Sequence, residues 1–347
     1  MFIKVIFINS IDEMEMETDK QRPKALVLLS GGLDSLLATR IILDQDVDVE
    51  AVHFITPFCR CSRDSVSRAS KDFGIKLHTI FLGQEFLDIV ANPPHGYGSQ
   101  MNPCIDCRLL MFRKAKELAD KIGASFLVTG EVLDERPFSQ RFKTMLLIER
   151  KAGLEGKILR PLSAKLLPPT EAERMGWVDR KKLLAIRGRR RTPQIELAVK
   201  YGIKDYPTPS GGCLLTDPAF ARRIRDHLKH EGKLTLKDAI LLMIGRHFRI
   251  NGVKIIVGRN IDENNRLLSI AEQNQIPYLM VKEYKGPTTL IIGEVNSDIA
   301  EKAAAITIRY SDAPKNVPVN VLYKGKDKEI EITAMALDEE QISRLRI

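Results

Sequence analysis

Long apolar stretches are missing from this sequence, and none approaches the ~18 residues that a membrane-spanning helix needs. The first residues, MFIKVIFINS, are apolar, but the acidic stretch IDEMEMETDK follows them. A secretory signal would instead end in a small-residue cleavage site. We therefore interpret residues 1–22 as an N-terminal extension, either a short strand or a disordered segment, and we expect a cytoplasmic protein with no membrane partner.

Cysteine is also scarce, with five residues among 347, at positions 59, 61, 104, 107 and 213. So few cysteines in a chain of this length exclude a disulfide-rich secreted scaffold. Their positions are more informative than their number, because three of them lie in loops rich in proline and glycine.

Acidic residues are outnumbered, since 45 Asp and Glu face 54 Lys and Arg, which gives a net charge of +9. This balance favours a polyanionic partner such as a nucleic acid. A basic, solvated surface would give the same composition, so charge alone does not identify the partner.

Residues 23–165 alternate between strand and helix patterns. Strands are predicted over 24–29, 47–55, 75–82 and 125–130, and helices over 35–45, 64–74 and 105–123. Such alternation is typical of an α/β domain with a doubly wound parallel sheet. The loops that follow Leu29, Ile55, Leu82 and Val128 should then share one rim of the sheet, where such folds bind ligands.

Two further regions follow this domain. Residues 166–230 read as a basic, mainly helical segment that carries Cys213. Residues 231–347 read as a smaller α+β domain, with helices over 236–245, 263–273 and 298–310 and strands over 253–258, 278–283, 288–293, 319–325 and 329–334. A domain of this size can form its own core.

The first strand runs directly into the sequence SGGLDS, residues 30–35, and then into a helix. Glycine permits positive φ and close backbone approach, and a helix start offers unpaired N–H groups to an anion. Ser30 and Ser35 add hydroxyl groups, and Asp34 could hold Mg²⁺ against the phosphates. An ordinary capped strand–turn–helix is the alternative, but six consecutive residues of this kind favour a phosphate site.

SGGLDS resembles the SGGxDS loop of the PP-loop ATP pyrophosphatases, which cleave ATP between its α and β phosphates and adenylate a substrate oxygen. The resemblance implies that ATP is bound by Ser30, Gly31, Gly32, Asp34 and Ser35. Relatives carry a TG-x motif next to the nucleotide, here VTGEVLDERPFSQR. Gly130 would make room for the ligand, and Glu131, Arg136 and Gln140 would line the site, unless this stretch is only a loop leading to a helix capped by Ser139. Arg160 could also meet a phosphate.

The cysteines suggest which branch of that family the chain resembles. Cys104 and Cys107 form a Cys-x-x-Cys at a loop-to-helix junction, and Cys213 follows a glycine turn. Because a helix dipole stabilises a thiolate, we expect these thiols to be more acidic than a free cysteine. In an ATP-activating enzyme, reactive cysteines indicate sulfur transfer.

Two versions of that chemistry stay open. Cys104, Cys107 and Cys213 could ligate three irons of a 4Fe–4S cluster, an arrangement seen in cluster-dependent tRNA thiolases of the PP-loop family. Alternatively, one cysteine carries a persulfide and another resolves it as a disulfide. A structural zinc site would need a fourth ligand, and plain buried thiols are the remaining alternative. We expect no functional role for Cys59 and Cys61.

Basic residues cluster in two places outside the sheet. The candidate RNA-binding set is Arg187, Arg189, Arg190 and Arg191, then Arg222 and Arg223, and finally Arg259. Lysine and arginine clusters of this kind bind RNA by releasing counterions, although a charge run is often only a solvated face. The stretch IIVGRNIDENNRL, residues 255–267, resembles the RNA-binding domain that ends NFACT proteins. An asparagine helix cap would explain the same turn.

Taken together, residues 24–347 resemble bacterial PP-loop tRNA thiolases related to the tRNA 2-thiouridylase and 4-thiouridine synthetase families. The resemblance implies thiolation of a tRNA uridine with ATP and Mg²⁺, with 2-thiouridine slightly favoured, and a sulfur donor that is sulfide or a persulfide-carrying protein. A homodimer is one option for the assembly. The alternatives are a PP-loop amidotransferase or synthetase acting on a small metabolite, and a non-catalytic RNA-binding protein.

Overall fold

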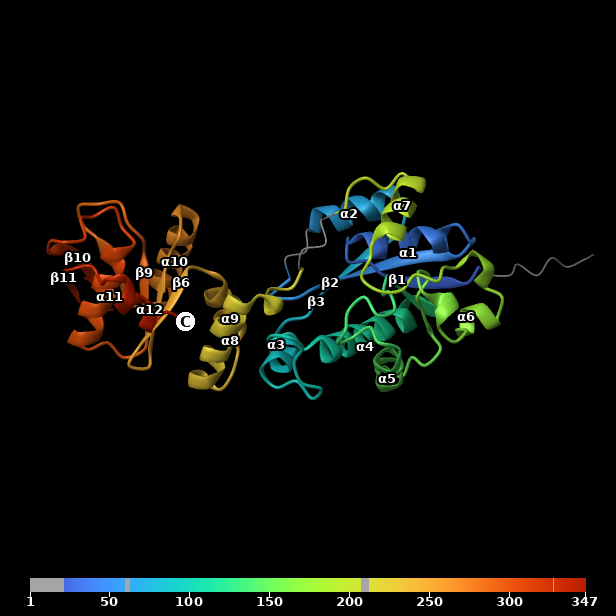
Figure 1. Cartoon of the computed structure of the whole chain (residues 1–347), viewed down its shortest axis with the longest axis horizontal. Helices are drawn as coiled ribbons and strands as arrows, with labels where there is room; N and C mark the ends of the chain where they lie inside the picture. Colours follow the sequence, from blue (N-terminus) through green and yellow to red (C-terminus); the bar gives the residue numbers. More distant parts are fainter. Residues whose placement is uncertain (1–21, 60–62, 207–211, 327) are drawn as a thin grey trace, which may run out of the picture.

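The structure, a computed structural model, describes residues 22–59, 63–206, 212–326 and 328–347. It contains two separate sheets at opposite ends of an elongated molecule, with helices α8 and α9 between them (Figure 1). Residues 1–21 of the expected N-terminal extension and Cys61 lie outside the described residues.

The first sheet is parallel and five-stranded, with strand order β3-β2-β1-β4-β5. Its strands are β1 (Lys24–Leu28), β2 (Asp48–Ile55), β3 (Lys76–Phe81), β4 (Phe126–Thr129) and β5 (Ile158–Leu159). The prediction of a doubly wound α/β domain is confirmed. Since the strands are parallel, their carboxyl ends meet at one rim, as the sequence predicted.

Helices cover both faces of this sheet because side chains alternate along each strand. Ala25 and Val27 of β1 face a cluster that includes α1 (Leu33–Leu43), whereas Leu26 and Leu28 face α3 (Gln84–Ala91) and α4 (Cys104–Ile122). Figure 1 shows α1 and α2 (Arg63–Asp72) on one face, and α3, α4 and α5 (Phe142–Ala152) on the other.

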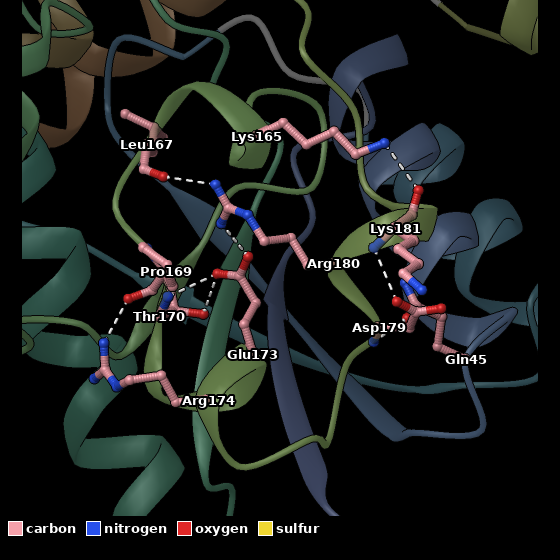
Figure 2. A network of polar contacts seen from close by, with 10 residues as sticks. All are labelled: Gln45, Lys165, Leu167, Pro169, Thr170, Glu173, Arg174, Asp179, Arg180 and Lys181. Carbon is pink, nitrogen blue, oxygen red and sulfur yellow. Dashed lines mark hydrogen bonds and ion pairs between the residues drawn. The ribbon is translucent and has the colours of Figure 1, made fainter.

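The segment after β5 folds back onto the same sheet. Val178, Leu183 and Ile186 join the buried cluster on the α1 face, together with Ala198 of α7 (Thr192–Lys200). Polar contacts hold the return around α6 (Glu171–Arg174), where Arg180 pairs with Glu173 and donates to the Leu167 carbonyl at 3.0 Å (Figure 2). Leu167 and Glu173 also border a cavity of about 350 Å³ beside β5. Residues 166–200 therefore belong to the domain of the first sheet.

Helices α8 (Pro218–Glu231) and α9 (Leu236–Met243) pack on the α3 and α4 side of the first sheet. Phe220 and Ile224 of α8 and Leu242 of α9 belong to the buried cluster of that face. An ion pair between Asp226 of α8 and Arg249 links the pair to the second sheet.

The second sheet is six-stranded, with order β11-β10-β8-β9-β7-β6, and its neighbouring strands pair antiparallel. Its strands are β6 (Arg246–Ile250), β7 (Val253–Val257), β8 (Tyr278–Val281), β9 (Thr289–Ile292), β10 (Val319–Lys324) and β11 (Glu329–Ala334). Helices α10 (Ile261–Asn274), α11 (Ser297–Arg309) and α12 (Glu339–Leu345) complete this α+β domain.

Three elements were not anticipated, namely α3, β6 and α12. A helix after Ser139 was considered as an alternative, and α5 is that helix, although its N-cap is Arg141. Strand β6 has only five residues, RHFRI, of which three are charged or polar, so its alternation is short and weak. Within the described residues, no helix is long and apolar enough to cross a membrane.

Candidate active site

The loop between β1 and α1 is built as a cradle. Gly31 has φ of +79°, a conformation that glycine adopts without strain, and a Cβ there would come within 2.9 Å of Val66 Cγ2. The Ser35 hydroxyl lies 3.2 Å from the Ser30 hydroxyl and donates to the Gly32 carbonyl at 2.8 Å. Among the described residues, no side chain caps the start of α1. Its first N–H groups therefore remain available to an anion.

Gly130, the first residue after β4, packs directly against this loop. A Cβ at Gly130 would lie 2.5 Å from the backbone of Asp34 and Ser35. The sequence suggested that this glycine makes room for a ligand. The structure gives the space to the first turn of α1, so Gly130 sets how closely β4 approaches the phosphate loop.

Asp34 lies among charged side chains from three segments. Arg191, at the start of α7, places Nη2 3.4 Å from Asp34 Oδ2. Burial raises the pKa of Asp34, and the charges of Arg191 and Arg136 and the side chain of Gln194 oppose that rise. Burial also raises the pKa of Glu135, and the neighbouring Asp34 charge adds to the effect. The surroundings of the loop are therefore polar, partly buried and mixed in charge.

The three cysteines that the sequence grouped are free and lie near one another. Cys104 and Cys107 begin α4. The backbone of Cys213 forms an isolated antiparallel β-bridge with the backbone of Cys59. Each thiolate influences its neighbours, because charge on Cys104 or Cys213 raises the pKa of Cys107. Cys59 itself is disulfide-bonded.

The expectation of acidic thiols is wrong for two of these cysteines. Burial raises the pKa of Cys107 to about 12, with Arg108 only partly opposing it. Burial likewise raises the pKa of Cys213. Both side chains pack against the apolar cluster beneath α4, so removal from water outweighs the helix dipole.

The loop before Cys104 is fixed by buried polar contacts. The Asn102 amide donates to Cys104 Sγ at 3.0 Å. His95 contacts the Asp106 carboxylate through its backbone N–H at 3.0 Å and through Nδ1 at 2.5 Å. The sequence gave no reason to single out Asn102 or His95, because both lie in an irregular stretch without periodicity.

One residue connects the cysteines with the phosphate loop. The positive charge of Arg136 lowers the pKa of both Asp34 and Cys213 against the effect of burial. Arg136 lies in the turn after β4, which Gln140 closes by accepting from the Arg136 N–H at 3.0 Å. The structure thus brings the predicted nucleotide residues and the predicted sulfur residues to one rim of one sheet.

The side chains at this rim offer metal ligands of two kinds, a carboxylate oxygen and cysteine thiols. Asp34 Oδ1 is buried and has no partner in the described part of the chain, which leaves a hard oxygen ligand for Mg²⁺. Three free thiols suit a soft metal such as iron. However, among the described residues no three His, Cys, Asp or Glu side chains are arranged so that they could hold a metal ion.

Glu131 and Arg160 occupy a buried ionic network instead of facing the loop freely. Arg160 Nε lies 3.0 Å from Glu131 Oε2, and Arg160 also pairs with Glu149 of α5. Arg108 of α4 reaches Glu131 Oε1 at 3.0 Å. The network ties the helix that carries Cys104 and Cys107 to the ends of β4 and β5.

The arginines that the sequence assigned to RNA lie in different environments. Arg189, Arg190 and Arg222 are exposed. Arg187 is exposed but pairs with Asp134 at 2.7 Å, and Arg223 donates to the Leu242 carbonyl at 3.2 Å. Arg191 faces Asp34. These observations divide the set into surface residues and residues held by other parts of the chain.

The turn at Gly258-Arg259-Asn260 also proves to be internally bonded. Asn260 caps α10 by accepting from the Glu263 N–H at 2.9 Å, and Arg259 Nε lies 3.0 Å from the Glu263 carboxylate. Asn264 accepts from the Thr288 N–H at 3.1 Å and so joins α10 to the start of β9. The asparagine cap considered as an alternative is therefore present.

Comparison with known proteins separates the same two domains. Residues 21–165 match the family model described as thiamine biosynthesis protein (ThiI). Residues 245–346 match the model described as NFACT protein RNA binding domain.

Curated relatives are similar over the first domain. A tRNA sulfurtransferase of Desulfurococcus amylolyticus is 29% identical over 142 residues, covering 40% of this chain and 29% of that protein. A tRNA-specific 2-thiouridylase MnmA of Sulfurimonas denitrificans is 33% identical over 118 residues, covering 32% and 35%. The chain thus spans about a third of the length of these relatives.

Two solved structures show a distant likeness. A 4-thiouridine synthetase–RNA complex with bound ATP is 23% identical, with a TM-score of 0.39, covering 63% of this chain and 52% of that one. The U34-tRNA thiolase NcsA from Methanococcus maripaludis, with its [4Fe-4S] cluster, is 16% identical, with a TM-score of 0.32, covering 64% and 70%. On the family models, then, residues 21–165 are similar to the ThiI family and residues 245–346 to the RNA-binding domain of NFACT proteins.

Proposed function

We propose that this chain is an ATP-dependent tRNA thiolase that adenylates a carbonyl oxygen of a uridine and replaces that oxygen with sulfur. The observation that carries the proposal is that the Ser30–Ser35 loop leaves the carboxyl end of β1, and that Cys104 and Cys107 begin α4, which leads into the neighbouring parallel strand β4. A phosphate cradle and a group of free thiols at one rim are what consecutive adenylation and sulfur transfer require. The ThiI-type and NFACT-type domains support tRNA as the substrate, and we slightly favour carbon 2 of the uracil over carbon 4.

In the first step the uracil carbonyl oxygen attacks the α-phosphorus of ATP, and the bond to the bridging α–β oxygen breaks. The Ser30–Ser35 loop holds the departing pyrophosphate through its N–H and hydroxyl groups, and Asp34 holds Mg²⁺. Gly130 keeps β4 close enough for Arg136 to add positive charge beside the reacting phosphate. A sulfur nucleophile then adds to the activated carbon, and AMP leaves.

Two sulfur routes remain within the proposal. In one route, Cys104, Cys107 and Cys213 would hold a 4Fe–4S cluster that offers an iron to sulfide, and this would require the three thiols to move from an arrangement that does not suit a metal ion. In the other route, one of these cysteines carries a persulfide taken from a donor protein. Its outer sulfur joins the uracil carbon while a second cysteine forms a disulfide with the first, and a dithiol reductant later restores both thiols.

Replacing Asp34 and Cys213 separately tests whether the phosphate loop serves adenylation and the cysteines serve sulfur transfer. Asp34→Asn should abolish pyrophosphate release, because it removes the ligand for Mg²⁺. Cys213→Ser should retain ATP binding and tRNA-dependent pyrophosphate release but form no thionucleoside. Both are measured with labelled ATP and by nucleoside analysis of the tRNA.

Two results would contradict the proposal. Normal thiolation by Cys213→Ser would show that Cys213 is not needed for sulfur transfer and would exclude the three-cysteine site. Pyrophosphate release that requires ammonia or glutamine and a small acid, and ignores tRNA, would assign the chain to the amide-forming synthetases.

A further inference from the structure

The first turn of α7 contains a buried amide, Gln194, whose side chain lies near Asp34 and acts to lower the pKa of its carboxyl group but makes no hydrogen bond within 3.5 Å among the described residues. Gln194 is fully buried, and neither Oε1 nor Nε2 has a hydrogen-bond partner among the described residues. A buried polar group without a partner costs about 1–3 kcal/mol, so native proteins seldom keep one without a reason. The usual reason is a ligand or ion that completes the site.

The unpaired atoms of three side chains meet at the phosphate loop. Gln194 lies close enough to Asp34 to influence its carboxylate. Arg191 contacts Asp34 only at 3.4 Å, which is long for an ion pair, and its Nε is buried without a partner in the described chain. Asp34 Oδ1 is equally buried and unpaired. Arg191, Gln194 and Asp34 therefore have hydrogen-bond donors and acceptors that bind no other described residue.

The fold places this turn opposite the loop through several contacts. Arg187 forms a parallel bridge with Leu133, and the Gly188 N–H donates to the Leu133 carbonyl at 2.7 Å. Arg187 also pairs with Asp134. Further along, Ala198 of α7 is buried in the cluster that includes α1. The position of Arg191 and Gln194 is thus fixed at both ends of a short segment.

We propose that Arg191 and Gln194 bind the phosphates of Mg·ATP from the side opposite the glycine loop. The Arg191 guanidinium pairs with a phosphate oxygen, and the Gln194 amide donates Nε2–H to the phosphate while Oε1 accepts from a water on Mg²⁺. Both residues lie outside residues 21–165, the stretch that matches the ThiI model. This inference rests on the proposed function for its ligand and extends the nucleotide site to a segment that the sequence assigned to RNA.

The sequence context is consistent with this assignment. Gln194 precedes Ala198 by four residues, which puts a polar side chain on the buried face of α7. Ile195 and Val199, on the other side of the helix, are exposed. An amide on the inner face and apolar residues on the outer face reverse the usual pattern of an amphipathic helix.

The test uses the full chain and the analogue α,β-methylene ATP, which cannot be cleaved between its α and β phosphates. Its affinity is measured calorimetrically with Mg²⁺ for wild type, Arg191→Met, Gln194→Leu and Lys200→Met. We expect the first two variants to raise Kd about ten- to hundredfold, as loss of a hydrogen bond to a charged group does. Lys200→Met, an exposed cation at the end of the same helix, should leave Kd unchanged.

A stability measurement separates ligand binding from a structural role. Since Gln194→Leu replaces an unpaired buried amide with an apolar side chain of similar size, its melting temperature without nucleotide should equal or exceed that of wild type. A lower melting temperature with unchanged Kd would make Gln194 a structural residue and overturn the inference.

The remaining outcomes distinguish the inference from the proposed function. If Arg191→Met and Gln194→Leu bind the analogue like wild type, the inference fails and the thiolase proposal is untouched. If wild type binds the analogue and the two variants do not, yet no thionucleoside forms with tRNA, the inference stands and the thiolase proposal fails. If wild type binds no nucleotide at all, both fail.

Discussion

At the residue scale, two glycines determine the shape of the phosphate loop for different reasons. Gly31 adopts a positive φ that other residues reach only with strain, whereas Gly130 leaves space for the backbone of another segment. The sequence suggested positive φ and close approach for the loop glycines, but beside Gly130 it expected a ligand where the structure places the backbone of Asp34 and Ser35. The distinction matters because only the second depends on contact between β4 and α1.

Gly130→Ala is expected to lower the free energy of unfolding by about 1–3 kcal/mol, the usual cost of overpacking. The added methyl group would meet the backbone of Asp34 and Ser35, which cannot move aside as a flexible side chain can. Urea denaturation followed by Trp177 fluorescence measures the change, because Trp177 packs in the same domain.

Gly212→Ala is the matched control, since no atom of the described residues lies within 4 Å of a Cβ at Gly212. It should change the free energy of unfolding much less. Equal effects at both positions would contradict the close approach of β4 to α1.

At the element scale, α4 is held to the sheet by the network of Arg108, Glu131, Arg160 and Glu149. These side chains come from four different elements or loops, and Glu131, Arg160 and Glu149 are buried. Buried ion pairs add little when intact, but removal of one partner leaves charges unpaired inside the protein.

Glu131→Gln should therefore destabilise the first domain by about 3–5 kcal/mol, because it leaves the charges of Arg160 and Arg108 without their common carboxylate. Glu155→Gln removes the partner of Arg150 in an exposed pair, and we expect a change below about 1 kcal/mol. Similar denaturation midpoints for the two variants would show that the network has no such role.

The hairpin of β6 and β7 provides a pH-dependent prediction. Burial, with a smaller contribution from the charge of Arg249, lowers the pKa of Lys254 to about 8. A lysine whose pKa is lowered by folding destabilises the folded state most at pH values below about 8, and this penalty is relieved as the pH rises towards the unfolded pKa of about 10.4. Burial also lowers the pKa of His247, so a further loss of stability follows below about pH 6.5.

Lys254→Met should raise the stability of this domain at pH 7 by about 3 kcal/mol, and by less at pH 9.5, where the unfolded lysine begins to lose its proton. Hydrogen exchange of β7 amides, corrected for the intrinsic rate at each pH, measures the effect. Lys285→Met removes an exposed lysine of the same domain and should show neither change. A gain that is independent of pH would indicate better packing instead of relief of a buried charge.

Elements with strong apolar periodicity were predictable from the sequence. The burial and the contacts of individual polar residues were harder to predict. The strands and helices of the first domain follow from alternating and helical apolar patterns, as in Val47–Ile55 and Leu33–Leu43. Arg191 was grouped with its exposed neighbours because a charge run does not show which member turns inward. The acidity of the thiols was misjudged because the helix dipole can be inferred from sequence, whereas the burial of Cys107 cannot.

At the scale of the whole molecule, α8 and α9 lie between the two sheets (Figure 1). Exposed arginines lie on the first domain and on α8. Arg189, Arg190 and Arg222 are the surface members of the proposed RNA-binding set. A tRNA that reaches the rim of the first sheet could therefore contact both regions. The NFACT-type domain would add a further site at the other end.

The salt dependence of tRNA binding tests this arrangement. Replacing Arg189 and Arg190 together by Gln should reduce the slope of log K against log salt by about 1.4–1.8, since each phosphate contact contributes ~0.7–0.9. Arg150→Gln, an exposed arginine of α5, should leave the slope unchanged. An unchanged slope for the double variant would exclude Arg189 and Arg190 from the RNA surface.

The central claim is that ATP activation and sulfur transfer occur at one rim on a tRNA uridine, and one measurement tests it most directly. Anaerobically reconstituted protein is incubated with unmodified tRNA, Mg·ATP and sulfide, and the tRNA is then digested for nucleoside mass spectrometry. We predict a 2-thio or 4-thio uridine that disappears when ATP is omitted and when Asp34→Asn is used. Absence of any thionucleoside, both with sulfide and with a persulfide-carrying donor protein, would contradict the account.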